Sequence, residues 1–217
     1  PHIKIRQLNK FYHVQNTQVH ALKDIHLDIP QGKILGIIGK SGAGKSSLLR
    51  TLNGLEQANE GSIHIHQQEI SALNHHDLIQ LRQKMGMVFQ HFNLMSAKTV
   101  WENVALPLKI SNFNKADIEQ RVNEVLELVG LSDKAEHYPS QLSGGMRQRV
   151  ALIRTLALEP DILLLDEPFS ALDYQTRLEV SDDIYKILKE QNKTAILVTH
   201  DISEAIAMGD KVIILSA

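Results

Sequence analysis

The segment from Gly39 to Ser46 carries glycines, a lysine and a serine at the spacing that a phosphate-binding loop requires, G-x-x-x-x-G-K-[ST]. Glycine has no Cβ, so the backbone N–H groups of such a loop can approach phosphate oxygens closely. The Lys45 ammonium can reach the β- and γ-phosphates of a nucleotide, and the Ser46 hydroxyl can ligate Mg²⁺. The alternative is a plain glycine turn between a strand and a helix. We predict a nucleotide site formed by Gly39, Lys40, Ser41, Gly42, Ala43, Gly44, Lys45, Ser46 and Ser47.

Asp166 and Glu167 form a pair of carboxylates directly after the apolar run 162–165. Parallel sheets bind ligands at the carboxyl ends of their strands, and this run is typical of a buried parallel strand. We expect Asp166 to hold Mg²⁺, and Glu167 to take a proton from the water that attacks the phosphate. General-base assistance of this kind contributes about 10²–10⁴ in rate.

Ser143, Gly144 and Gly145 form a second glycine-rich helix start, which precedes an apolar helical stretch. The free N–H groups of such a helix start can also bind an anion. One chain rarely needs two phosphate cradles for a single nucleotide. We therefore expect the second cradle to serve a nucleotide that is bound mainly by another subunit.

The elements that would position the phosphate loop are predicted on both of its sides. Residues 34–38 form an apolar run of the kind found in a buried strand, and leucines at positions 48, 49, 52 and 55 recur at helical spacing. The N-terminus of that helix would point at the phosphate, where the helix dipole favours an anion.

The rest of the chain alternates between strand and helix patterns. Apolar residues alternate with polar ones at 25–29 and 63–65, which predicts half-buried strands. Residues 114–130 predict a helix that starts near Asn114 and ends at Gly130. The apolar runs 195–198 and 212–215 indicate further parallel strands.

Composition excludes several other classes of protein. The chain has 217 residues, a net charge of −2 and no cysteine. Such a charge gives no basic field for nucleic acid, and the lack of cysteine excludes disulfides and thiolate metal sites. No apolar run approaches the roughly 20 residues that span a bilayer, and residues 1–4 carry no signal-peptide core. We expect a soluble intracellular protein that reaches a membrane only through a partner.

The chain resembles the ATP-binding cassette family, the nucleotide-binding subunits of ABC transporters. The resemblance rests on motifs that occur in the family's order: the loop 39–46, Gln90, the segment 142–145, Asp166 with Glu167, the segment 170–173, and His200. It implies an α/β fold of the P-loop NTPase type, with a central, mainly parallel sheet, an antiparallel β subdomain and a helical subdomain. Residues 1–217 would form a single ATPase domain, with the helical subdomain inserted at about 91–150.

The resemblance also implies an ATPase that works as a dimer of two copies. Two ATP molecules would lie between the phosphate loop of one copy and Ser143, Gly144 and Gly145 of the other. Gln90 would contact Mg²⁺ and the attacking water, and His200 would contact the γ-phosphate. Asp173 would link the two sites.

An aromatic side chain near the N-terminus stacks on adenine in this family. Tyr12 falls at that position, with Phe11 as the competing residue, which we expect to face the core. Stacking on a base tolerates sequence variation, so the register is loosely specified.

The family has several branches, and different parts of the chain resemble different ones. Residues 90–108 resemble methionine importers, whereas residues 166–173 and 199–205 resemble nitrate, sulfonate and taurine importers. We interpret the chain as a mosaic, natural or engineered, that changes between Asn112 and Gln141. Since it stops at Ala217, we expect it to lack the solute-sensing regulatory domain of methionine importers.

The importer resemblance implies a peripheral protein on the cytoplasmic side of the bacterial inner membrane. Its partners would be transmembrane permease subunits and, indirectly, a solute-binding protein. The alternatives are an ATPase of the lipoprotein-release or macrolide-export type, which usually carries Thr-Gly-Asn-Leu-Asp near residues 170–173, and an engineered hybrid without a permease.

An apolar stretch after Gln90 is predicted to receive a helix of the permease. Exposed apolar residues commonly mark an interaction site, and the alternative is that these side chains pack inside the helical subdomain. The residues are Phe92, Asn93, Leu94, Met95, Ala97 and Trp101.

Two smaller sequence patterns concern a pair of histidines and the start of a helix. His64 and His66 could bind a metal, but two strand histidines without further ligands are more often solvated. Asp201 with Glu204 predicts a capping box after His200.

Overall fold

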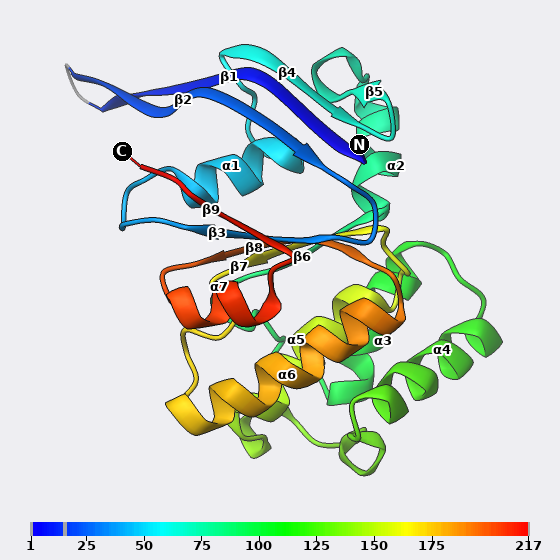
Figure 1. Cartoon of the computed structure of the whole chain (residues 1–217). Coiled ribbons are helices and arrows are strands. Elements are labelled where there is room, and N and C mark those ends of the chain that lie inside the picture. Colours follow the sequence, from blue (N-terminus) through cyan, green and yellow to red (C-terminus); the bar gives the residue numbers. More distant parts are fainter. Residues whose placement is uncertain (1, 15–16, 217) are drawn as a thin grey trace.

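The computed structural model describes residues 2–14 and 17–216, in which two β-sheets stand one above the other with helices between and below them (Figure 1). The larger sheet has five strands in the order β6-β7-β8-β3-β9, and all of its pairings are parallel. The strands are β3 (Ile34–Ile38), β6 (Met85–Val88), β7 (Ile162–Asp166), β8 (Thr194–Thr199) and β9 (Lys211–Ile214).

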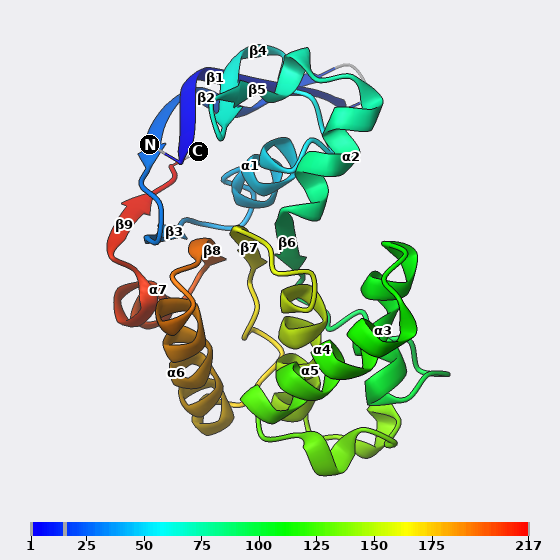
Figure 2. The same ribbon diagram turned by 90° about the vertical axis from the view of Figure 1, so that its right-hand side faces the viewer.

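The four-stranded sheet is antiparallel and has the order β2-β1-β4-β5. Its strands are β1 (Ile3–Val14), β2 (Thr17–Ile29), β4 (Glu60–Ile65) and β5 (Gln68–Glu69). The strands predicted at 25–29 and 63–65 are confirmed, with Leu27, Ile29, Ile63 and Ile65 buried. This sheet covers the upper face of α1 (Lys45–Leu52) in both views (Figures 1 and 2).

Strands β3, β6, β7 and β8 are largely buried, as their apolar sequences predict. The edge strand β9 is the exception to the predicted burial of the run 212–215, because Ile214 is 75% exposed. In β7, Ile162 and Leu164 join the core between the two sheets, while Leu163 and Leu165 face the helices on the other side. Those helices are α5 (Gly144–Leu156), α6 (Tyr174–Glu190) and α7 (Ile202–Met208).

A third core forms among α3 (Val100–Ile110), α4 (Lys115–Leu128) and α5. Helix α4 matches the helix predicted at 114–130: Asn114 caps it by accepting from the Asp117 N–H, and Gly130 follows its end with φ +65°. Figure 2 shows α3 and α4 on the side of the parallel sheet away from β1 and β2. This block begins inside the predicted helical insertion at about 91–150, and α5 extends past that bound to Leu156. The status of the insertion as a subdomain stays a prediction.

The helix predicted after the phosphate loop is shorter than its leucine spacing suggests. Leu48, Leu49 and Leu52 are fully buried, but α1 ends at Leu52 and Leu55 is 57% exposed. Gly54 has a φ of +67°, a left-handed conformation that turns the chain away from the helix axis.

The remaining elements are short connections. They are α2 (His75–Gln83) and the 3₁₀ turns at Ile70–Ala72, Ser132–Lys134 and Pro139–Gln141. Across residues 2–14 and 17–216, none of the helices combines the length and the hydropathy that crossing a membrane requires.

Candidate functional site

The phosphate loop connects β3 to α1, and Gly44 is the residue that precedes the helix. Its φ of +88° is left-handed, and a Cβ at this position would overlap the carbonyl oxygen of Ala21 on β2. Both observations require glycine. The loop thus places the start of α1 at the carboxyl edge of the parallel sheet, where such folds bind ligands.

Lys45 is the first residue of α1, and its ammonium is turned back onto the loop. Nζ donates to the carbonyl oxygens of Gly39 at 2.7 Å and Lys40 at 3.0 Å. The residue is only 6% exposed, so this charge is held among loop dipoles rather than in water. A phosphate in the loop would offer the ammonium a charged acceptor in their place.

Ser46 and Asp166 meet, although 120 residues separate them in the sequence. The Ser46 hydroxyl donates to Asp166 Oδ1 at 3.1 Å, from α1 to the end of β7. Burial raises the pKa of the Asp166 carboxyl, and the bond from Ser46 partly opposes that shift. Two oxygens of the kind that Mg²⁺ prefers are therefore adjacent, in a place where a cation would offset the cost of a buried charge.

Glu167 and His200 form a second pair beside the first. His200 Nδ1 lies 3.2 Å from Glu167 Oε2, and the two residues follow the neighbouring strands β7 and β8. Glu167 has a left-handed φ of +46°, and its N–H donates to the Val198 carbonyl at 2.8 Å. A non-glycine residue in this conformation indicates a local constraint, and here it directs the carboxylate toward His200.

Gln90 follows β6 and is exposed. Within the described part of the chain, no hydrogen bond joins its side chain to Ser46 or Asp166. The structure therefore places Gln90 at the same edge of the sheet without bringing it into contact with the proposed Mg²⁺ ligands.

Tyr12 and Phe11 point to opposite sides of β1. The Tyr12 hydroxyl lies 3.0 Å from Ser47 Oγ and also donates to the carboxylate of Glu56. Phe11 is partly exposed and stacks on His20 with ring centroids 4.2 Å apart, so the expectation that it faces the core is wrong. The geometry favours Tyr12 as the aromatic residue beside the phosphate loop. No local sequence pattern predicts the contact between Tyr12 and Glu56, which are 44 residues apart.

The second cradle begins α5, as predicted. Ser143 caps the helix by accepting from the Met146 N–H at 3.2 Å. A Cβ on Gly145 would lie 2.8 Å from Thr176 Cγ2 and 3.2 Å from Val180 Cγ2, so glycine lets α5 pack closely on α6. Asp173 caps α6 in the same way, through the Thr176 N–H at 3.1 Å.

The two cradles are separate within one copy of the chain. Among residues 2–14 and 17–216, no hydrogen bond or ion pair joins Ser143, Gly144 or Asp173 to the loop 39–46. The start of α5 lies on the opposite side of the parallel sheet from α1 in both views (Figures 1 and 2). Within one chain, the two cradles therefore lie on different sides of the parallel sheet.

The apolar stretch after Gln90 is partly exposed and partly packed. Met95 is 47% exposed, and Asn93 and Ala97 are also exposed. Phe92 instead packs against the core beneath the parallel sheet, whereas Leu94 and Trp101 pack against the α3–α5 core. The expectation of an exposed apolar surface therefore holds for Met95 and not for Leu94.

The capping box predicted at Asp201 and Glu204 is only half correct. Asp201 caps α7 by accepting from the Ser203 N–H at 2.8 Å. The Asp201 N–H, however, donates to Thr199 Oγ1, and Glu204 accepts from that same hydroxyl at 2.6 Å. Glu204 is turned into the protein and is 7% exposed, so it cannot complete the box.

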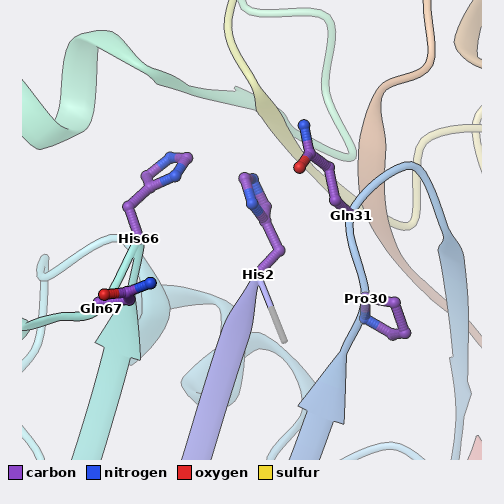
Figure 3. A pocket seen from close by; sticks show the side chains of 5 residues that line it. All are labelled: His2, Pro30, Gln31, His66 and Gln67. Carbon is purple, nitrogen blue, oxygen red and sulfur yellow. The ribbon is translucent and has the colours of Figure 1, made fainter.

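A pocket lies at the end of β1 and β4, where His2 and His66 meet edge to face with ring centroids 4.3 Å apart (Figure 3). His66 Nε2 is 3.5 Å from Asp161, and burial lowers the pKa of His2. His64 takes no part in this pairing. In the part of the chain that the structure describes, no group of three or more histidine, cysteine or carboxylate side chains could hold a metal ion.

The chain is similar to named proteins over nearly all of its length. It is 59% identical over 215 residues to "Methionine import ATP-binding protein MetN 1" of Acinetobacter baylyi, which covers 99% of this chain and 60% of that protein. It is 51% identical over 199 residues to "Methionine import ATP-binding protein MetN" of Desulfitobacterium hafniense, covering 92% and 58%. The chain thus spans about three fifths of the length of these relatives. The predicted mosaic is not tested by these matches and stays a prediction.

Solved structures of two ABC proteins have the same fold as this chain. The ATP-binding cassette MJ0796, described as a dimeric post-hydrolysis state bound to ADP and Pi, superposes with a TM-score of 0.86 at 37% identity, covering 98% of this chain and 94% of that one. The cbiO1 protein of Clostridium perfringens superposes with a TM-score of 0.89 at 30% identity, covering 99% and 84%.

A family model adds the last comparison. Residues 22–170 match the model described as "ABC transporter", a span that contains the phosphate loop, the second cradle and both carboxylates. With the cassette fold and the paired polar residues at its sheet edge, this chain belongs to the ABC transporter family.

Proposed function

We propose that this chain is the ATP-binding and ATP-hydrolysing subunit of an ABC importer. The observation that carries the proposal is the meeting of two pairs, Ser46 with Asp166 and Glu167 with His200, beside the buried ammonium of Lys45. These groups come from the carboxyl ends of the neighbouring strands β7 and β8 and from α1, the helix that follows β3. They supply a cation for phosphate, oxygens for a metal and a carboxylate base.

Each of these groups has a distinct role in the proposed reaction. Lys45 and the N–H groups of the loop bind the β- and γ-phosphates. Ser46 and Asp166, with Gln90, would hold Mg²⁺, which when bound neutralises charge on the phosphate oxygens. Glu167 takes the proton of the attacking water, and His200 donates a hydrogen bond to the γ-phosphate. Tyr12 stacks on the adenine.

The active form in this proposal is a dimer of two copies. Ser143, Gly144 and Gly145 would bind the γ-phosphate of the nucleotide held by the other copy, and Asp173 would reach across toward that site. The separation of the two cradles within one chain supports this arrangement. So does the similarity to a cassette that is described as dimeric with ADP and Pi.

Methionine is the solute that we propose, because both relatives reported above are named as methionine import proteins. Their names do not favour an exporter. The partners would be transmembrane permease subunits and, through them, a solute-binding protein. The chain would be a peripheral protein on the cytoplasmic face of the bacterial inner membrane, with no role for nucleic acid.

The dimer proposal is tested by the dependence of ATP hydrolysis on protein concentration. We expect the rate per subunit to rise with concentration and to level off once the dimer is saturated. Ser143→Arg should remove that rise and most of the activity, because a bulky cation would occupy the second cradle. Binding of ATP to the variant's own phosphate loop should be unchanged.

A matched control is Ser132→Arg, which adds the same charge to an exposed serine outside both cradles. It should follow the concentration curve of the unchanged protein. A rate per subunit that is constant over the whole concentration range would contradict the dimer.

The permease contact is tested by charged substitutions in the stretch after Gln90. Met95→Glu should prevent co-purification with the permease subunits while leaving the melting temperature and the basal ATPase rate nearly unchanged, because Met95 is 47% exposed. Leu94→Glu should instead lower the melting temperature, because Leu94 packs on the α3–α5 core and a buried charge is costly. Normal permease assembly by Met95→Glu would contradict the contact.

A further inference from the structure

Arg177 lies in the first turn of α6, four residues after Asp173, and its side chain is only 21% exposed. The N-terminus of a helix carries a partial positive charge, so a cationic side chain is disfavoured there. An arginine at this place therefore needs acceptors outside the helix. The acceptors of Arg177 lie in two different segments of the proposed site.

The guanidinium of Arg177 reaches two separate segments. Nη2 donates to the Leu172 carbonyl at 3.1 Å, and Nη1 donates to Asp201 Oδ2 at 3.2 Å. Nε faces Glu204 Oε1 at 3.6 Å, an ion-pair distance that is too long for a hydrogen bond. Leu172 directly precedes Asp173, and Asp201 directly follows His200. A single side chain thus joins the loop that ends in Asp173 to the segment that carries His200.

The segment that carries His200 is held from its other side as well. The Asp201 N–H donates to Thr199 Oγ1 at 3.0 Å, and that hydroxyl donates to the buried Glu204 at 2.6 Å. The residues on both sides of His200 are therefore fixed in one network that ends on Arg177. His200 itself is 3.2 Å from Glu167, so any movement of the network would change the geometry of that pair.

We propose that Arg177 is a positioning residue that fixes the Asp173 loop relative to His200. This inference rests on the proposed function, because it requires His200 and Asp173 to act on bound ATP. In the proposed dimer, His200 contacts the nucleotide of its own chain and Asp173 reaches the site of the other chain. Arg177 would therefore couple the two sites. A planar guanidinium can hold two acceptors in fixed directions, which the ammonium of lysine cannot.

The alternative is that Arg177 forms an ion pair that only stabilises the packing of α6 on α7. The two roles are separated by measuring kcat, ATP affinity and melting temperature for Arg177→Met and Arg177→Lys in the full chain. We expect Arg177→Met to lower kcat about tenfold or more while ATP affinity stays within about twofold. Arg177→Lys, which keeps the charge but lacks the planar fork of donors, should lie between Arg177→Met and the unchanged protein.

The matched control is Lys186→Met, on an exposed cation of the same helix that pairs with Asp182. Its kcat should not change.

A double-variant comparison decides whether Arg177 acts through His200. If it does, Arg177→Met should lower the residual kcat of His200→Ala by less than about twofold, against tenfold or more in the unchanged background. The same factor in both backgrounds, or an unchanged kcat of Arg177→Met, would overturn the inference. If Arg177→Met does not fold, Arg177→Lys takes its place in the same comparison. An unchanged protein that hydrolyses no ATP at any concentration would overturn the proposed function, and this inference with it.

Discussion

Exchanging Glu167 for glutamine should lower ATP hydrolysis by about 10²–10⁴-fold, while ATP binding stays close to that of the unchanged protein. The amide keeps the size of the side chain but cannot accept a proton from the attacking water. Glu167 is held by its backbone bond to Val198 and by His200 at 3.2 Å, so the substitution removes a positioned base without removing a ligand of the nucleotide. Phosphate release and equilibrium ATP binding, measured on the same preparation, give both quantities.

The variant should also accumulate the ATP-bound dimer, because the step that ends this state is blocked. Sedimentation with ATP and Mg²⁺ should show twice the mass found without nucleotide. Glu179→Gln, on an exposed position of α6, is the matched control and should turn over ATP at the unchanged rate. Equal phosphate release by the two variants would show that Glu167 is not the base.

Among the predicted effects, the second largest is a loss of ATP affinity when the ammonium of Lys45 is removed. A hydrogen bond to a charged group is worth about 1.5–3 kcal/mol, which converts to a loss of about 10- to 150-fold in ATP affinity for Lys45→Ala. The ammonium is buried beside the loop, so water can replace it only poorly. The measurement is a titration of a fluorescent ATP analogue with each protein.

Lys115→Ala is the control for this measurement, because Lys115 is an exposed lysine at the start of α4, away from the phosphate loop. It should bind the analogue as the unchanged protein does. Lys45→Ala should also melt at a lower temperature without nucleotide, since the loop loses the donor to Gly39 and Lys40. Undiminished affinity of Lys45→Ala would remove Lys45 from the site.

Much of the parallel sheet can be predicted from the sequence because a strand buried on both faces needs uninterrupted apolar residues. The runs at 34–38 and 162–165 meet that requirement and become β3 and most of β7. The phosphate loop can be predicted for a similar reason, since close approach of backbone to phosphate dictates glycine at fixed positions. In both cases the constraint acts on neighbouring residues and leaves a local pattern.

The contacts that the sequence does not reveal join residues that are far apart along the chain. Tyr12 meets Glu56 across 44 residues, and Arg177 meets Asp201 across 24. No spacing rule connects such pairs, because the approach of strand β1 to α1, or of α6 to α7, is decided by packing. The one local indication that Arg177 has partners elsewhere is its position near a helix N-terminus, where a cation is disfavoured.

The end of α1 shows that a correct helical periodicity can still predict the wrong last residue of a helix. The leucine at position 55 continues the helical spacing of Leu48 and Leu52, yet it is exposed because Gly54 turns the chain first. Periodicity describes which residues would share a face if the helix continued. It carries no information on where backbone conformation ends that helix.

The position of β3 has a consequence for the synthesis of the protein. This strand pairs with β8 and β9, so both of its neighbours are made roughly 160 or more residues after it. At about 5–20 residues per second, a ribosome needs on the order of 10–30 s to supply the first of them. During that time the apolar residues of β3 have no sheet to join, although the antiparallel hairpin of β1 and β2 can already form. Nascent chains that are interrupted before β8 would therefore expose an unpaired apolar strand that is prone to aggregate. Whether such chains aggregate would depend on chaperones rather than on the stability of the finished protein.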